Sequence, residues 1–436
     1  MLGVEALLEV GQLLELDCQG LCRLLLVPRS ADGRGGVSPR QVGRVTGADS
    51  QLLHHLRHQT TRRGGPGGGP ADRATPCQTR PVPNDSAPRI GFIGSGVIAW
   101  AHGIALSGLM KDGLVEAELG LVHDRDPNRS RGFAEHLGFE EAASAEEVAA
   151  GCDVVYVCTS TAGHLEAARV AARHRRAVFC EKPLGRSLAE AAALVEVVGE
   201  AGVPAQVGLV LRTAPVFRAL GRLVESGELG RPMAATMRDD QFFPIQGHYG
   251  STWRKERDEA GSGTLLEHAI HDLDAARNWF GPIRSVAATS ANFAGHEEIE
   301  DAATGILTFE GGLSVAMVSV WHSVLSRPST RRVEVIFEHG FASFENDFTG
   351  PITIQTSAAT TTERCDPPAF VERLSLPEGL GIGALPYVEE NKDFLDTLAA
   401  GQPPSPSLVD GLRAHEAVDA WYRSAAAGGV PVAGPF

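Results

Sequence analysis

The sequence predicts an α/β domain built on a doubly wound parallel sheet, followed by an α+β domain with a large, mostly antiparallel sheet. From residue 89 to about 210, short apolar runs alternate with amphipathic stretches, which is typical of βαβ units. After about residue 230, apolar strands follow one another in succession. Residues 61–87 are rich in Gly, Pro and Arg and predict a linker before the folded part.

The expected elements follow the chain in a regular order. In the first domain the strands lie in RIGFIG, EAELGLVHD, DVVYVCT, AVFCEKP and PAQVGLV, each separated from the next by an amphipathic helix. In the second domain they lie in MAATMRDDQFFP, SVAATSANFAG, ATGILTFEGG, LSVAMVSVWH, RRVEVIFEHG and FASFENDF. One long helix is expected over 264–280, and two helices close the chain near 386–400 and 407–427.

These patterns divide the chain into three parts. We expect residues 1–88 to form a poorly ordered extension and linker, 89–210 the α/β domain, and 211–430 the α+β domain, whose closing helices pack back towards the first domain. Within the extension, residues 37–57 weakly resemble a helix-turn-helix, and a poorly ordered segment is the simpler interpretation.

Composition excludes several classes of function. The net charge of −15 argues against nucleic acid as the main partner, and no run approaches the ~18 apolar residues of a membrane span. Acidic residues stand near the start, where a signal peptide would be basic, so we expect a cytoplasmic protein. The seven cysteines are scattered without paired CxxC motifs, so neither disulfides nor a metal site is expected.

A glycine-rich turn joins the first strand to the first helix. Gly94 and Gly96 begin a G-x-G-x-x-A pattern in which Ala99 allows close packing between helix and strand. Gly94 permits the tight turn, and Gly96 lets the backbone approach a pyrophosphate at the helix N-terminus, beside Val97 and Ile98. The alternative is an ordinary glycine turn, but the strand–turn–helix context favours a Rossmann dinucleotide site.

Asp124 ends the second strand, where a carboxylate can bind an adenosine ribose. The interval from Gly94 exceeds the usual value of about 20 residues, because the segment SGLMKDGLVE is inserted. Asp124 would repel a 2′-phosphate, so we expect NAD as the cofactor, while Arg125 and Arg129 keep NADP possible.

Lys182 is an unusual residue in this chain, which contains 35 Arg and only four Lys. It follows the apolar strand at 177–180, and ligands of doubly wound sheets bind beyond the carboxyl ends of strands. Lysine can lose its proton where its surroundings lower its pKa. Lys182 is therefore a candidate proton donor or point charge, with a solvated loop lysine as the alternative.

Three segments together resemble the Gfo/Idh/MocA family, the relatives of glucose–fructose oxidoreductase and inositol dehydrogenase. They are RIGFIGSGVIA, CDVVYVCTSTAGHLEAARVAARHRRAVFCEKPLG and GSGTLLEHAIHDLDAARNWFG, and the likeness spans about 89–430. The resemblance implies that Glu181 and Lys182 lie at the nicotinamide, that Lys182 also meets the substrate, and that the Lys182–Pro183 bond is cis.

The resemblance also implies that the loop after the strand DVVYVCT contacts the cofactor. This loop contains Cys158, Thr159 and Ser160, and His164 follows it. The family commonly has Thr-Pro-Asn where this chain has Thr159, Ser160 and Thr161, so the details of the contact differ here.

The predicted helix over 264–280 carries the other catalytic candidates. Periodicity places Glu267, His271 and Asp274 opposite its apolar face and, by itself, in solvent. The resemblance instead implies that Glu267 and His271 match an Asp/His pair facing the nicotinamide, with His271 as the base and Glu267 as an orienting or substrate contact. His268 is a further candidate.

Together these features predict an NAD(P)-dependent oxidoreductase that transfers hydride between nicotinamide and a hydroxyl carbon of a cyclic polyol, sugar or related compound. Arg212, Trp253 and Arg254 are the expected substrate contacts. Two alternatives remain open, an NAD-dependent glycoside hydrolase of the same fold and a non-catalytic dinucleotide-sensing regulator. We also expect a homo-oligomer, either a dimer or a tetramer.

Overall fold

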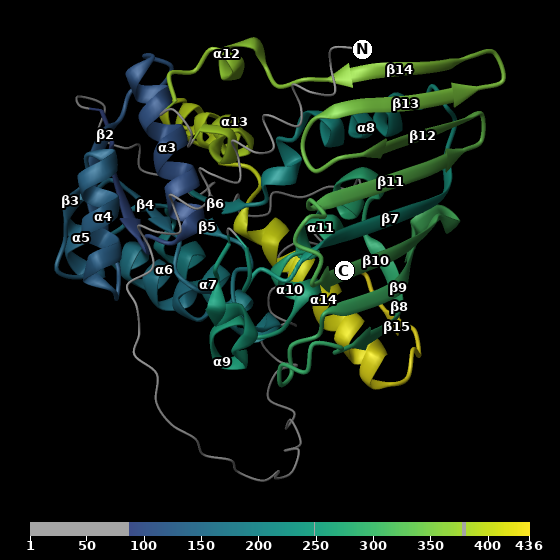
Figure 1. Ribbon diagram of the computed structural model, residues 1–436, viewed down its shortest axis with the longest axis horizontal. Helices are drawn as coiled ribbons and strands as arrows, with labels where there is room; N and C mark the ends of the chain where they lie inside the picture. The colour runs from purple at the N-terminus through teal and green to yellow at the C-terminus, as the bar shows by residue number, and fades with distance from the viewer. Residues whose placement is uncertain (1–86, 248, 377–380) are drawn as a thin grey trace, which may run out of the picture.

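The computed structural model describes residues 87–436 except 248 and 377–380. It contains two sheets, with the first to the left and the second to the right in Figure 1. The extension expected before residue 89 and the helix-turn-helix pattern at 37–57 fall outside the described residues, apart from 87 and 88. In the part of the chain that the structure describes, no helix combines the length and apolar character that crossing a membrane requires.

Sheet A is entirely parallel and has the strand order β3-β2-β1-β4-β5-β6. The bounds are β1 Arg89–Ile93, β2 Glu118–His123, β3 Glu140–Glu141, β4 Val154–Val157, β5 Ala177–Glu181 and β6 Ala205–Gly208. The central strands are buried on both faces, which explains their continuous apolar runs. The order changes direction at β1 and β4, whose carboxyl ends therefore border the ligand crevice.

Helices cover both faces of sheet A. The bounds are α3 Val97–Lys111, α4 Pro127–Leu137, α5 Ala145–Gly151, α6 His164–Arg173 and α7 Leu188–Ala201. One core joins the sheet to α5, α6 and α7, and the other joins it to α3 and α4. Asp126 caps the start of α4, and Gly138 ends it with a φ of 86°, so the local sequence sets both ends of this helix.

Sheet B has the order β14-β13-β12-β11-β7-β10-β9-β8-β15, and only its β7–β10 pair is parallel. The bounds are β7 Pro232–Phe242, β8 Ile283–Ala291, β9 Ala302–Phe309, β10 Ser314–His322, β11 Thr330–Phe337, β12 Gly340–Glu345, β13 Gly350–Thr356, β14 Thr360–Cys365 and β15 Val432–Ala433. The predicted fold class is confirmed. The sequence did not predict β13, β14 or β15, because the hairpin β13–β14 is polar and mostly exposed and β15 has two residues.

One face of sheet B packs against α8 Pro215–Ser226, α11 Ile270–Phe280 and α14 Leu408–Ala426. The closing helices also reach the first sheet, since α13 Gly381–Ala399 packs against α3, and the start of α14 joins the core under α7 (Figure 1). Short helices complete the chain, namely α9 Arg257–Ala260, α10 Thr264–Glu267, α12 Ala369–Glu372 and the 3-10 turns η1 Thr161–Gly163, η2 Val210–Arg212, η3 Thr252–Lys255 and η4 Glu310–Gly312.

The single helix expected over 264–280 is in fact two helices, α10 and α11, separated by His268 and Ala269. Periodicity alone would place its polar face in solvent, but Glu267, His271 and Asp274 are all buried. The break lets His268 turn towards Arg331, which lies 3.1 Å from its Nε2. Tertiary contacts with sheet B and with sheet A's loops therefore decide a geometry that helical periodicity cannot show.

Candidate active site

The glycine-rich turn after β1 leaves open space at the start of α3. Gly94 has a φ of +95°, and a Cβ there would lie 2.5 Å from the Cys158 backbone oxygen, so this position requires glycine. At Gly96, a Cβ would meet no described atom within 4 Å outside its chain neighbours. Val97 is exposed and Ile98 half-buried in a first turn without acidic side chains. This open, positive helix end fits a dinucleotide pyrophosphate.

Asp124 joins the end of β2 to this turn. Its Oδ2 accepts hydrogen bonds from the Ser95 backbone N at 2.7 Å and the Ser95 Oγ at 3.0 Å, and its Oδ1 accepts one from the Asp126 N at 2.9 Å. Arg125 is exposed, and its guanidinium lies 3.3 Å from Glu259 of α9. Sequence reasoning missed Ser95, although its place between two pattern glycines was the available signal.

His164 contacts the loop after β4 and the turn after β5. Its Nδ1 lies 2.7 Å from the Pro183 carbonyl and its Nε2 lies 3.2 Å from the Thr159 carbonyl. Burial lowers the pKa of this imidazole, so a neutral ring donates to one carbonyl, and His164 positions two loops instead of facing a ligand. The Cys158 side chain is buried as well, while Thr159 and Ser160 are half-buried at the strand end.

Lys182 lies at the end of β5, as the sequence predicted, and the Lys182–Pro183 bond is cis, as the family resemblance implied. Its backbone N donates to Glu181 Oε2 at 3.0 Å, and its Nζ donates to the Glu267 backbone oxygen at 2.8 Å. Burial, reinforced by the positive charge of Arg254, lowers the pKa of Lys182 to about 8. A lysine in this state can donate a proton near neutral pH.

Glu267 is buried, and both of its carboxylate oxygens have partners. Thr161 Oγ1 donates to Oε1 at 2.6 Å, and Arg254 Nε donates to Oε2 at 3.1 Å. Arg254 in turn lies over the Trp253 ring, 4.5 Å from its centroid. Glu267 therefore links the loop after β4, through Thr161, to the segment before α9, and Thr161 was not among the predicted site residues.

His271 is buried beside these groups, and its Nδ1 has no hydrogen-bond partner among the described residues. Burial is the largest cause that holds the pKa of His271 well below its usual range, and the nearby charges of Lys182 and Arg331 lower it further. The imidazole is therefore neutral at neutral pH, which is the form in which histidine accepts a proton.

Arg331 is the main residue that sequence reasoning missed. It is buried, and its guanidinium contacts Asp272 at 3.1 Å, Asp347 at 3.3 Å and Asp239 at 3.6 Å. The nitrogen that faces Asp239, Nη2, also lies 3.1 Å from His268 Nε2. Because arginine only donates, His268 Nε2 accepts, and the proton of the neutral ring sits on Nδ1, 3.0 Å from Asp239.

The same neighbours determine the ionisation of Asp239. Burial raises the pKa of Asp239, but the charge of Arg331 and the contact with His268 outweigh burial and lower it to about 2. Strand alternation was the available signal for both residues. Asp239 has the phase of buried Met237 on β7, and Arg331 has the phase of buried Val333 on β11, directly opposite in the register.

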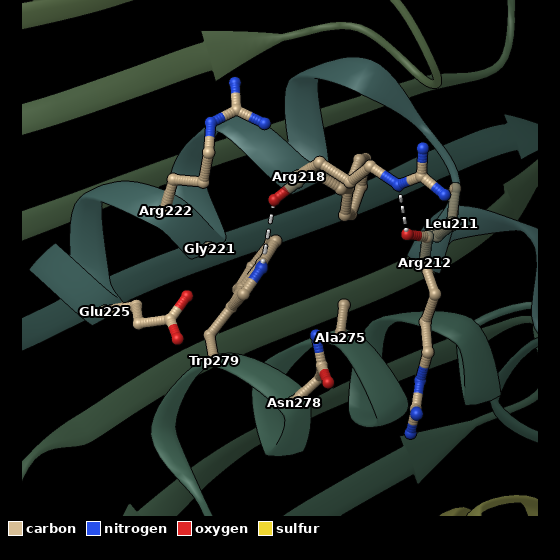
Figure 2. Close-up of a pocket in the computed structure, with 10 residues that line it drawn as sticks. Leu211, Arg212, Arg218, Gly221, Arg222, Glu225, Ala275, Asn278 and Trp279 are labelled. Carbon is tan, nitrogen blue, oxygen red and sulfur yellow. Dashed lines mark hydrogen bonds between the residues drawn. The ribbon is translucent and has the colours of Figure 1, made fainter. Parts of the chain in front are cut away.

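Arg212, an expected substrate contact, forms two ion pairs within the protein. Its guanidinium pairs with Asp274 at 2.6 Å and with Asp410 at 3.3 Å, which fixes η2 to α11 and α14. A pocket of about 300 Å³ lies between α8 and α11. Its lining side chains, drawn in Figure 2, are Leu211, Arg212, Phe217, Arg218, Gly221, Arg222, Glu225, Ala275, Asn278 and Trp279. None of these residues belongs to the group around Lys182.

Comparison with known proteins identifies both parts of the chain. Residues 88–209 match the model of an oxidoreductase family with an NAD-binding Rossmann fold, and residues 217–343 match the GFO/IDH/MocA C-terminal domain. The 1,5-anhydro-D-fructose reductase of Ensifer adhaerens is 31% identical over 58% of this chain and 73% of its own length. The inositol 2-dehydrogenase of Rhizobium meliloti is 28% identical over 78% of this chain and 97% of its own.

Solved structures have the same fold. A dehydrogenase from Bordetella pertussis, solved with NADH and UDP-GlcNAcA, matches with a TM-score of 0.68 and 21% identity over 81% of this chain and 99% of that chain. Three findings point to the same family: the turn at Gly94 and Gly96, the lysine at the end of β5, and the two matched domains. The chain therefore belongs to the Gfo/Idh/MocA family of NAD-binding oxidoreductases.

Proposed function

We propose that this protein is an NAD-dependent dehydrogenase that oxidises a secondary hydroxyl of a cyclic polyol, a sugar or a related compound. The observation that carries the proposal is the meeting of Lys182, from sheet A, with Glu267 and His271, from the second domain. The names of relatives support the substrate class, because they include a 1,5-anhydro-D-fructose reductase, inositol 2-dehydrogenases and a levoglucosan dehydrogenase.

His271 is the proposed base. Its neutral ring would take the hydroxyl proton of the substrate, while bound nicotinamide would supply the hydride acceptor. Lys182 would donate a hydrogen bond to the substrate oxygen, where negative charge develops, and would relay the hydroxyl proton by passing its own proton to His271 and taking up that of the substrate. Glu267 would hold Arg254 and Thr161 in place at the substrate, and Trp253 would form part of the wall.

The remaining predicted cofactor contacts belong to the same proposal. Gly94, Gly96, Val97 and Ile98 would hold the pyrophosphate, and Asp124, with Arg125 beside it, would hold the adenosine ribose. The backbone at Cys158, Thr159 and Ser160, supported by His164, would border the nicotinamide half together with Glu181 and Lys182. Asp124 favours NAD over NADP because a 2′-phosphate would meet its negative charge.

The outer face of sheet B supports the proposed homo-oligomer. The helices cover the opposite face, whereas Ile306 and Ile336 are each about half exposed, at 51% and 50%. Their strand neighbours on this face include the small residues Ala234 and Ala316. A partly apolar sheet face of this kind suits pairing with a second copy. We also propose that the boundary between the two domains lies near residue 210 and that the protein is cytoplasmic.

The test is a panel of inositols, hexoses and amino sugars, screened for reduction of NAD and of NADP by the purified protein. We expect stoichiometric NADH release with at least one cyclic polyol or sugar. Turnover of a glycoside without net NADH would instead support the alternative hydrolase. If the protein binds NAD tightly but turns over no compound, and if the His271→Ala variant binds NAD in the same way, these results would support the non-catalytic regulator.

A further inference from the structure

A carboxyl group without a partner lies beneath the Lys182 turn. Glu390, on α13, is completely buried, and neither of its carboxyl oxygens has a hydrogen-bond partner among the described residues. A buried carboxyl normally forms hydrogen bonds, because an unpaired polar group loses its hydrogen bonds to water on burial, and an unpaired charge is more costly still. Glu390 is not used by the mechanism proposed above, so its protonation state requires an explanation.

Two other titratable side chains meet Glu390. One ligand atom from each of Glu390, Glu181 and His102 lies within 4.8 Å of the others, and all three residues are buried. His102 Nε2 lies 2.9 Å from Glu181 Oε1, and its Nδ1 lies 3.1 Å from Asn391 Oδ1. Glu181 Oε2 accepts the Lys182 backbone N–H at 3.0 Å. Glu181 therefore connects this buried group directly to the lysine of the active site.

Among the residues that the structure describes, Glu390 forms no ion pair with a Lys or Arg side chain. The titratable groups that interact electrostatically with Glu390 or lie beside it are His102 of α3, Tyr156 of β4, Cys158 after β4, Glu181 of β5, and Tyr387 and Asp393 of α13. Burial is the main cause that raises the pKa of Glu390 well above its usual range, and the negative charges of Glu181 and Asp393 raise it further. Two ionised carboxylates this close in a buried site would repel each other strongly.

A divalent cation is a less suitable solution than a proton. Both nitrogens of His102 are already engaged, one by Glu181 and the other by Asn391, and both oxygens of Glu181 have partners. A metal ion would have to break these contacts to obtain three ligands, and a structural zinc site commonly has four. A proton on Glu390 leaves every existing contact in place.

We propose that His102, Glu181 and Glu390 form a buried unit in which Glu390 stays protonated, so that the negative charge of the carboxyl pair resides on Glu181, which positions Lys182. The role assigned to Lys182 rests on the proposed function, whereas the charge state of the unit does not. Glu181 is fixed from the other side by β6, since a Cβ on Gly208 would lie 2.5 Å from Glu181 Oε1. Glu390 and His102 are positioning residues in this unit.

The first test compares unfolding of the wild type with that of Glu390→Gln. A protonated Glu390 has a folded pKa above its unfolded value, so its contribution to stability is complete below the unfolded value and is lost as the pH rises towards the folded pKa. Between pH 5 and pH 7, the unfolding constant of the wild type should therefore rise by up to about tenfold per pH unit relative to the variant. The matched control is Asp396→Asn, which removes an exposed carboxyl on the same helix. Relative to this control variant, the unfolding constant of the wild type should not rise over the same pH range.

The second test reads the charge on Lys182 directly. Because the chain has only four lysines, lysine labelled with ¹³C at Cε gives four signals, and Lys182→Arg identifies the one from Lys182. Glu181→Gln should lower the pH midpoint of that signal, since the Glu181 charge supports the ammonium, whereas Glu390→Gln should leave the midpoint where it is. Neither measurement needs a substrate, so failure of the proposed function would not affect it.

Three outcomes would overturn the proposal. The first is unfolding curves of wild type and Glu390→Gln that keep a constant ratio across the pH range, which would mean that Glu390 is ionised when folded. The second is a shift of the Lys182 midpoint in Glu390→Gln as large as that in Glu181→Gln. The third is one equivalent of a divalent metal in the purified protein, detected by elemental analysis and lost in Glu390→Gln.

Discussion

Two glycines two positions apart should respond to alanine in opposite ways. At Gly96 the backbone φ is −73° and a Cβ would enter open space, so Gly96→Ala should fold normally and gain up to about 1 kcal/mol from reduced freedom of the unfolded chain. At Gly94 the φ is +95° and a Cβ would lie 2.5 Å from backbone atoms of Cys158. Backbone strain of about 1–3 kcal/mol and overpacking of about 1–3 kcal/mol should both destabilise Gly94→Ala.

For NAD binding, in contrast to stability, alanine at position 96 should be unfavourable. A methyl group at the N-terminus of α3 would occupy the space through which a pyrophosphate reaches the backbone N–H groups. Loss of one hydrogen bond to a charged group costs about 1.5–3 kcal/mol, so the Kd for NAD should rise about 10- to 150-fold in Gly96→Ala. In Gly94→Ala the free energy of unfolding should fall by about 2–6 kcal/mol, the sum of the two terms above.

Urea denaturation measures the unfolding free energies, and isothermal titration calorimetry measures NAD affinity. Gly132→Ala is a suitable control, since a Cβ there also meets nothing within 4 Å among the described residues but lies on α4, away from the turn. The reasoning is refuted if Gly96→Ala binds NAD as tightly as the wild type, or if Gly94→Ala is as stable as Gly96→Ala.

Three further predictions concern chemistry and cofactor choice. Lys182→Arg should lower kcat by about 10²–10⁴-fold, because guanidinium keeps its proton; a near-normal kcat would mean that Lys182 supplies only charge. His271→Ala should lower kcat similarly while NAD affinity, measured by calorimetry, survives; in the wild type the acid limb of kcat should lie below pH 6.5, since burial lowers the pKa of His271. Asp124→Ser should narrow the ratio of NADP to NAD dissociation constants, and a wild type that prefers NADP would contradict the ribose assignment.

The sequence by itself determined the features that depend on neighbouring residues. Apolar runs alternating with amphipathic stretches identified the parallel sheet, because each buried strand shows its own apolar run in the residues that form it. The spacing of Gly94 and Gly96 identified the turn, since the positive φ of Gly94 is a backbone requirement that glycine meets most readily, and Gly96 leaves the N-terminus of α3 free of a side chain. The position of Lys182 followed from the end of one strand, because parallel strands end at the same edge of a sheet.

Only the tertiary structure decided what covers each polar face. Helical periodicity showed that Glu267 and His271 share a polar side, but not that loops and strands from both domains bury it. Arg331 and Asp239 are far apart in the sequence and meet because β11 pairs with β7. Arg212 had several possible partners, and Asp274 and Asp410 are the ones that the packing of α11 and α14 brings to it. Contacts of this kind depend on which distant segments pack together, and a local pattern does not record that information.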